Sequence, residues 1–213
     1  MRASVAAVLA TGSTSLVDTK KVTGRYKDLL IAAVKTDCEE AGGVSPLVGY
    51  CALIAEVASS WSSSPSMQRF VLEILCRLRV IDPAVLVEYI VGAGGAAGSL
   101  PSRPDLWDII DSCMRVEPQG ASEEERGSLL ASAVSSCIRG VYERTERNQD
   151  LQKKDPLYVS LLSGMKKIVS TAMEVSGAER YNVLRAIEST AASLNGGAPT
   201  VIGTLVSAGV SGY

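Results

Sequence analysis

The chain has 213 residues, of which 46% are apolar and 5% aromatic, and it carries 21 basic and 23 acidic side chains but no histidine. This length and apolar content suffice for one or two packed domains and exclude a disordered chain. The absence of histidine excludes His-dependent catalytic triads and the common zinc hydrolase sites. Because small residues dominate and aromatic residues are few, closely packed helices are favoured over a β-sandwich, and we expect an all-α protein.

A serine or aspartate followed by proline marks the start of three predicted helices near the N-terminus, at Ser45-Pro46, Ser64-Pro65 and Asp82-Pro83. The side-chain oxygen caps the helix, and proline lacks only an amide hydrogen that has no partner in the first turn. These helices are predicted over 47–59, 65–80 and 83–91. An earlier helix is predicted over 24–41, with Thr23 as its cap and two glycines at its end.

Residues 92–104, GAGGAAGSLPSRP, are the best candidate for a domain boundary. Four glycines and two prolines in thirteen residues cannot continue a helix, and this composition suits a linker. We therefore predict an N-terminal helical subdomain over 1–91, a linker over 92–104, a middle helical subdomain over 105–150, and C-terminal helices with a tail over 151–213.

The clearest helix of the chain is predicted over 122–147. Adjacent apolar pairs recur every four residues between Leu129 and Tyr142, which places them on one stripe of a helix. Ser122 and Glu125 have the spacing of a capping box, and three consecutive glutamates in the first turn suit the helix dipole. Small residues in the middle of this helix allow a neighbour to approach closely. We expect it to be the central packing element.

Three further helices complete the pattern, over 106–116, 156–176 and 179–194. Asp155-Pro156 gives the start of the second, Gly177 is predicted to stop it, and the tail from residue 198 has no helix signal. The longest uncharged tract, near the C-terminus, is interrupted by glycines and does not resemble a transmembrane helix. The N-terminal residues likewise lack the pattern of a signal peptide.

Few residues offer catalytic chemistry. Residues 92–97 match GxGxxA, but prolines follow where the helix of a dinucleotide site would open. Five widely spaced cysteines lie within apolar helical patterns, which predicts buried free thiols in a reducing compartment. The acidic pairs fall in early helical turns, where the helix dipole favours them. We predict a non-enzymatic protein with no catalytic residues, no cofactor, no metal and no small-molecule substrate, with an enzyme that uses carboxylates alone as an alternative.

Charge is unevenly distributed along the chain. Residues 1–80 carry nine basic and seven acidic groups, residues 81–150 six and twelve, and residues 151–213 six and four. The middle of the chain is therefore acidic and both ends are basic. Opposite charges on one molecule favour head-to-tail self-association, or orient one end towards an anionic surface. An ordinary solvated surface with uneven charge is the alternative.

Two tracts carry a family resemblance. The first tract has two parts: Ser45-Pro46-Leu47 opens a helix, and Gln68-Arg69-Phe70-Val71 follows after a loop. The second tract is 130–144, LASAVSSCIRGVYER. In sequence, order and approximate separation they resemble tracts of the orthomyxovirus matrix protein, the influenza-type layer protein beneath the envelope. The resemblance implies two helical subdomains joined by a linker and a protein that polymerises into a shell. It also implies contacts with anionic lipid, viral ribonucleoprotein and envelope-protein tails.

The chain departs from that family in its basic residues and in its lack of histidine. The dense basic run of the family has no counterpart between Phe70 and Trp107, and its Cys/His cluster cannot form, so strong RNA binding and zinc binding are not expected. Attraction to an anionic membrane would rest on dispersed cations, each contributing about 1 kcal/mol near the surface. The candidates are Lys20, Lys21, Arg25, Lys27, Lys153, Lys154, Lys166 and Lys167.

These observations together lead to the prediction of a viral matrix protein. It would self-assemble into a layer beneath the viral envelope, bind anionic membrane peripherally, bridge to ribonucleoprotein and bind RNA weakly. It would be found in the virion, in the host cytoplasm or nucleus, and at the inner face of the plasma membrane. Two alternatives remain open: a helical nucleocapsid or coat protein that binds RNA, and a cellular helical adaptor.

Overall fold

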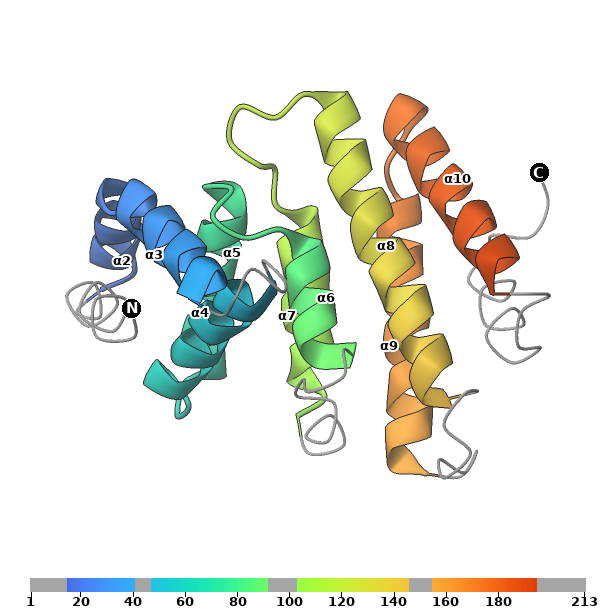
Figure 1. The fold of residues 1–213 in the computed structure, drawn as a ribbon, viewed down its shortest axis with the longest axis horizontal. Coiled ribbons are helices and arrows are strands. Elements are labelled where there is room, and N and C mark those ends of the chain that lie inside the picture. Colours follow the sequence, from blue (N-terminus) through green and yellow to red (C-terminus); the bar gives the residue numbers. More distant parts are fainter. Residues whose placement is uncertain (1–14, 41–46, 92–102, 146–154, 195–213) are drawn as a thin grey trace.

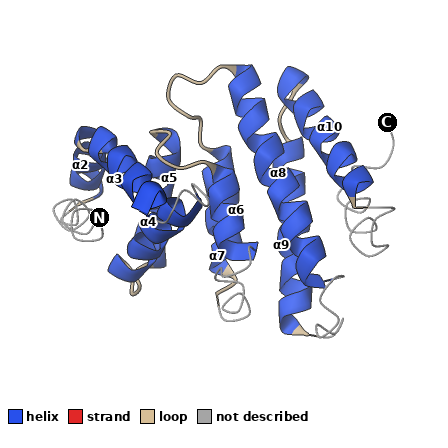
Figure 2. Ribbon diagram, in the orientation of Figure 1, coloured by secondary structure: helices blue, strands red, loops and turns tan. Residues whose placement is uncertain are grey.

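The computed structural model of the chain describes residues 15–40, 47–91, 103–145 and 155–194. Within these ranges every regular element is a helix and no strand is formed, which confirms the all-α prediction (Figure 1 and Figure 2). The helices are α2 (Leu16–Arg25), α3 (Lys27–Glu40), α4 (Leu47–Ser60), α5 (Pro65–Arg77), α6 (Pro83–Val91), α7 (Asp105–Arg115), α8 (Glu123–Thr145), α9 (Pro156–Met173) and α10 (Gly177–Ser193).

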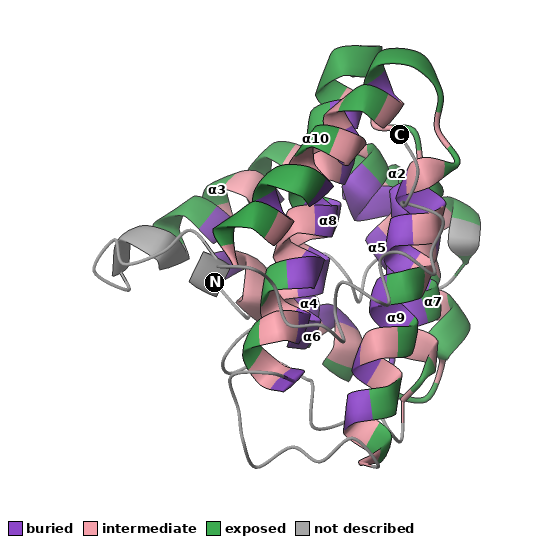
Figure 3. Cartoon of the chain, turned by 90° about the vertical axis from the view of Figure 1, so that its right-hand side faces the viewer, coloured by how far each residue is buried: buried purple, intermediate pink, exposed green. Residues whose placement is uncertain are grey.

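The helices pack in two layers. In one layer α3, α4, α6, α8 and α10 contact one another in that order, and in the other α2, α5, α7 and α9 do the same. Contacts between α2 and α3, α4 and α5, α6 and α7, and α8 and α9 join the layers. Viewed along the stack, the buried residues of the two layers face each other (Figure 3). Each helix pair thus packs mainly against its neighbours, as in an α-solenoid.

One hydrophobic core runs through the described part of the stack, from Leu30 in α3 to Ile187 in α10. Helices α6 and α7, which flank the glycine-rich segment, pack against each other and both contribute to this core. Most of the predicted linker lies outside the described residues, so the predicted division into subdomains stays a prediction. The predicted tail from residue 198 also lies outside them.

Local capping accounts for several helix starts. The Ser122 and Glu125 pair forms the predicted capping box: the Glu125 N–H donates to Ser122 Oγ at 3.2 Å, and the Ser122 N–H donates to Glu125 Oε2 at 3.0 Å. The second of these hydrogen bonds is the main reason that the pKa of Glu125 is lowered. At the start of α9 the Leu157 N–H donates to Asp155 Oδ1 at 2.7 Å. These contacts confirm the predicted starts of α8 and α9.

The predicted helix over 24–41 is wrong at its start. Residues Leu16–Arg25 form a separate helix, α2, in which Ser15 Oγ accepts the Asp18 N–H at 3.1 Å. The predicted cap, Thr23, is buried inside α2 and caps nothing. The chain leaves α-helical geometry at Tyr26, and α3 follows. Most residues of α2 are polar, so the sequence lacks the apolar spacing by which a helix is recognised. Packing buries the hydroxyl side chains of Thr19 and Thr23 in the positions that apolar residues usually occupy.

Two predicted helix ends are also wrong. Helix α5 stops at Arg77 because Arg79 has a φ of 59°, in the left-handed region. This turn lets the N–H of Val80 donate to the Leu75 carbonyl at 2.9 Å, and Val80 enters the core. Gly177 was predicted to stop α9, but α9 ends at Met173 and Gly177, with a φ of 59°, is the first residue of α10.

Helix α8 packs against α6, α9 and α10, as expected for the central helix. Close approach depends on glycines. A Cβ on Gly140 would lie 2.3 Å from Val91 Cγ2 in α6, and one on Gly127 would lie 2.8 Å from the Cα of Glu179 in α10. Both distances are far below van der Waals contact, so only glycine fits at these crossings.

Candidate functional site

The candidate site lies along one edge of the stack, where α5, α7 and α9 end and α6, α8 and α10 begin (upper side of Figure 1). We call this edge the rim; it comprises the connecting segments 78–82, 116–122 and 174–176 with the adjoining helix ends. The Gln119 N–H donates to the Arg77 carbonyl at 2.7 Å, which ties the 116–122 segment to the end of α5. The rim is therefore held in place by backbone contacts as well as by side chains.

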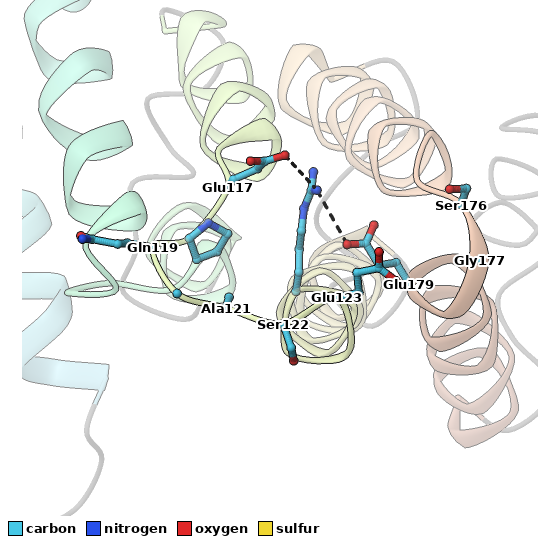
Figure 4. Close-up of a pocket in the computed structure, with 11 residues that line it drawn as sticks. Glu117, Gln119, Ala121, Ser122, Glu123, Ser176, Gly177 and Glu179 are labelled. Atoms are coloured by element: carbon cyan, nitrogen blue, oxygen red, sulfur yellow. Dashed lines mark ion pairs between the residues drawn. The ribbon is translucent and has the colours of Figure 1, made fainter.

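A cavity of about 630 Å³ opens between the 117–122 segment, the start of α8 and the turn between α9 and α10 (Figure 4). Three carboxylates line it, from Glu117, Glu123 and Glu179, and Arg126 is the single basic residue. Arg126 Nη1 lies 3.7 Å from an oxygen of Glu117 and 3.7 Å from an oxygen of Glu179 (dashed in Figure 4). We call this the acidic cavity, because one guanidinium cannot neutralise three carboxylates.

The groups of the acidic cavity differ strongly in their exposure. The side chain of Glu117 is 84% exposed, whereas that of Glu179 is 10% exposed. Arg126 Nε is buried and has no hydrogen-bond partner among the residues that the structure describes. The ion pairs are also longer than hydrogen bonds, so the arrangement holds charges close together without satisfying all of them. Such a surface suits a cationic or strongly polar binding partner.

A second cavity, of about 580 Å³, adjoins the first on the rim. Lys20 of α2, Arg77 at the end of α5 and Arg115 at the end of α7 line it, and we call it the basic cavity. It shares Glu117 and Gln119 with the acidic cavity. The rim therefore carries an acidic half and a basic half, separated by the 117–119 segment.

The cations of the basic cavity are not equivalent. The Arg115 guanidinium donates to both carboxylate oxygens of Glu174 and lies 3.4 Å from a carboxylate oxygen of Asp111. The hydrogen bond with Glu174 is the main reason that the pKa of Arg115 is raised. In contrast, Lys20 and Arg77 form no ion pair within the described ranges of the chain. These two side chains are left to attract an external anion.

Helix α2 brings three of the predicted membrane-binding residues together. Lys20, Lys21 and Arg25 lie on one exposed stripe that also contains Val17, 62% exposed, while Thr19 and Thr23 face the core. This spacing of three and four residues is that of a single helix face. Lys27 follows at the start of α3 and is half-buried.

The other four predicted residues do not join this surface. Lys166 and Lys167 lie on α9, far along the stack from α2 (Figure 1). Lys167 forms ion pairs with Asp108 and Asp111 of α7, so its charge is neutralised by carboxylates of the same molecule. Lys153 and Lys154 lie outside the described residues. Of the eight predicted cations, the structure therefore places three on one exposed face.

The rim itself was missed by sequence reasoning. The acidic cavity needs Arg126 and Glu179, which are far apart in the chain and meet only because α8 and α10 pack together. The basic cavity needs α2 together with the ends of α5 and α7. A partial signal existed, since Arg77 and Arg115 are basic residues in the last turns of predicted helices, where the dipole favours them.

Candidate groups for other chemistry are few in the described part of the chain. Cys76, Cys113 and Cys137 are free and buried, as predicted, and Cys51 is free and partly buried. Burial raises the pKa of Cys137 to about 12, which disfavours the reactive thiolate. The described residues include no group of three or more His, Cys, Asp or Glu placed to hold a metal ion. None of the described helices combines the length and apolar character needed to cross a bilayer.

Comparison with known proteins gives one match. A family model described as MIF4G like matches residues 1–186, which is most of the chain and includes every helix from α2 to α9. No curated protein and no solved structure matches the chain. The match does not bear on the resemblance to orthomyxovirus matrix proteins, which stays a prediction. Its extent, together with the all-helical stack, shows that the chain belongs to the MIF4G-like family.

Proposed function

We propose that this protein is a non-enzymatic scaffold that binds another protein on the exposed surface of its helix stack. The observation that carries the proposal is the stacking of helix pairs in two layers, because such stacks present long continuous surfaces for binding. Membership of a family of helical, adaptor-type domains agrees with it. Of the alternatives weighed from the sequence, this favours the helical adaptor.

The rim supports a specific mode of binding. Its acidic and basic halves lie side by side, so a partner with the reverse arrangement of charges would be attracted and also oriented. Charge complementarity of this kind mainly raises the association rate and rejects wrong partners. Apolar contacts would come from the half-buried residues between the charged side chains, such as Leu78 and Val116.

The scaffold proposal is tested by finding a protein that binds directly. The tagged full chain is recovered from cells of its source organism, and each co-purifying protein is produced separately and titrated with the purified chain by calorimetry. Saturable binding of one purified protein, with a dissociation constant of about 10 µM or tighter, is the expected result. If none of the co-purifying proteins binds when purified, the scaffold proposal fails.

A second candidate function, peripheral binding to an anionic membrane as in a matrix protein, is favoured by the exposed stripe on α2. Lys20, Lys21 and Arg25 point outward beside the exposed Val17, a combination of cationic and apolar groups that suits a lipid surface. A layer beneath a viral envelope, contacts with ribonucleoprotein and envelope-protein tails, and location in the virion belong to this candidate.

Charge reversal on α2 tests the membrane candidate. At about 1 kcal/mol per cation, Lys21→Glu with Arg25→Glu is expected to weaken co-sedimentation with phosphatidylserine vesicles at least about 30-fold. Lys166→Glu with Arg185→Glu, two exposed charge reversals on α9 and α10, is the matched control and should weaken binding by much less. A wild-type chain that stays in the supernatant at low salt would rule out this candidate, and equal losses in all variants would show that α2 is not the binding face.

A further inference from the structure

The two halves of the rim are complementary in charge. The basic half exposes Lys20 and Arg77, which form no ion pair within the described ranges of the chain. The acidic half exposes Glu117, which is held only loosely by Arg126 at 3.7 Å, and Glu123. Each half thus carries charge that is not neutralised locally.

Within one molecule, among the described residues, no ion pair joins the cations of the basic half to the carboxylates of the acidic half. The 117–119 segment lies between them, because Glu117 and Gln119 line both cavities. Its position is held by the hydrogen bond from the Gln119 N–H to the Arg77 carbonyl. The charges therefore remain displayed side by side on one edge of the protein.

We propose that two copies of this chain associate rim to rim, with the basic cavity of each facing the acidic cavity of the other. A two-fold axis through the 117–119 segment exchanges the halves, so every favourable contact is made twice. A closed dimer follows from this arrangement, because both halves of each rim are used in the same interface. The dimer would cover the rim that the scaffold proposal assigns to a partner protein, so a second copy and that partner would compete for it, but the dimer can be tested without the partner.

Charge swapping tests the dimer. The first variant, Lys20→Glu with Arg77→Glu, makes both halves of the rim acidic. The second, Glu117→Lys with Glu123→Lys, makes both halves basic. Each variant alone should repel its own copies, whereas in an equimolar mixture both contacts of the two-fold interface become attractive again. The variant with Glu143→Lys and Lys166→Glu changes exposed charges away from the rim and is the control.

Sedimentation velocity of the full chain gives the measurement, at about 0.05 M and about 0.5 M salt, because screening weakens exposed charge pairs. We expect the wild type and the control to dimerise at low salt and dissociate at high salt. Each rim variant should dimerise at least about tenfold more weakly, and the mixture should recover the dimer. Circular dichroism melting establishes that the variants are folded. If the lysine variant unfolds, Glu117→Gln with Glu123→Gln replaces it and should weaken the dimer without repulsion.

Three results would overturn the dimer. The first is a wild type that stays monomeric at low salt at concentrations of about 0.1 mM, where even weak specific dimers form. The second is a mixture of the two folded charge-reversal variants that stays monomeric. The third is growth into open polymers, since a closed two-fold interface cannot propagate.

Discussion

Replacing Gly164 with alanine is expected to lower the free energy of unfolding by about 3 kcal/mol, at the upper end of the usual cost of overpacking a core. A Cβ at this position would lie 2.0, 2.2 and 2.5 Å from Cε2, Cδ2 and Cζ2 of the Trp107 ring. The ring cannot simply turn away, because Trp107 is buried and its Nε1–H donates to Ser160 Oγ at 3.4 Å. Helix α9 would have to move away from α7.

Urea denaturation of Gly164→Ala is compared with that of Gly24→Ala. Gly24 lies on the exposed face of α2, and apart from the adjoining residues and backbone of α2 itself no atom lies within 4 Å of the position that an alanine methyl would occupy. Alanine there should therefore stabilise the protein by about 0.5–1 kcal/mol. Combining Gly164→Ala with Trp107→Leu should be less destabilising than the sum of the two single changes, because the clash is relieved. Equal stability of the two glycine variants would show that α7 and α9 do not pack as described.

Replacing Gln68 with methionine is expected to cost about 2–4 kcal/mol, because it removes three hydrogen bonds of a buried side chain, one of them fully buried, while keeping the side-chain volume. Gln68 is 2% exposed. Its Nε2 donates to the carbonyls of Ala58 and Trp61, both at 2.9 Å, at the end of α4. Its Oε1 accepts from Arg103 Nη2, also at 2.9 Å, at the start of α7. One amide therefore joins the ends of two helices.

The measurement is again the free energy of unfolding, with Ser66→Ala as the control on the exposed side of α5. The loss in Gln68→Met should persist at neutral pH and shrink in acid. Arg103 is held by Asp105, whose pKa is lowered chiefly by their hydrogen bond. A carboxyl group whose pKa is lower in the folded than in the unfolded state stabilises the protein at pH values above its unfolded-state pKa, which is near 4. That stabilisation is lost as the pH falls through the folded-state pKa. A Gln68→Met variant as stable as the control would contradict the network.

The predictions for Gly164 and Gln68 test the fold and are independent of the proposed functions. Gly164 and Gln68 lie in the packing between helices and outside both cavities of the rim. A failure of either prediction would therefore question the helix stack itself. The dimer and the membrane candidate rest instead on exposed charges, and they are tested by variants that leave the core unchanged.

Helix positions were largely predictable because their signals are local. The capping box of Ser122 and Glu125 spans three residues, and each Asp-Pro start spans two. Such contacts form within one turn, so they can be recognised without knowing what the helix packs against. The same locality made the all-α class predictable from composition and apolar spacing.

Helix ends and breaks were less predictable where packing decides them. The left-handed turn at Arg79 carries Val80 into the core, and no glycine in the sequence signals it. Thr23 looked like a cap but is buried among other helices. In both places a tertiary contact outweighs the local preference of the residue.

The sequence by itself determined an all-helical protein without histidine-based chemistry, the positions of most helices, and a cluster of basic residues over 20–27, whereas the helix that places three of these residues on one exposed face came only from the structure. Only the tertiary structure decided that the helices stack in two layers, that Lys167 is paired with α7 while Lys20 remains outward, and that an acidic and a basic cavity meet at Glu117. The reason is range: capping and periodicity act over a few residues, whereas the rim is assembled from helix ends far apart in the chain that meet only when the core forms.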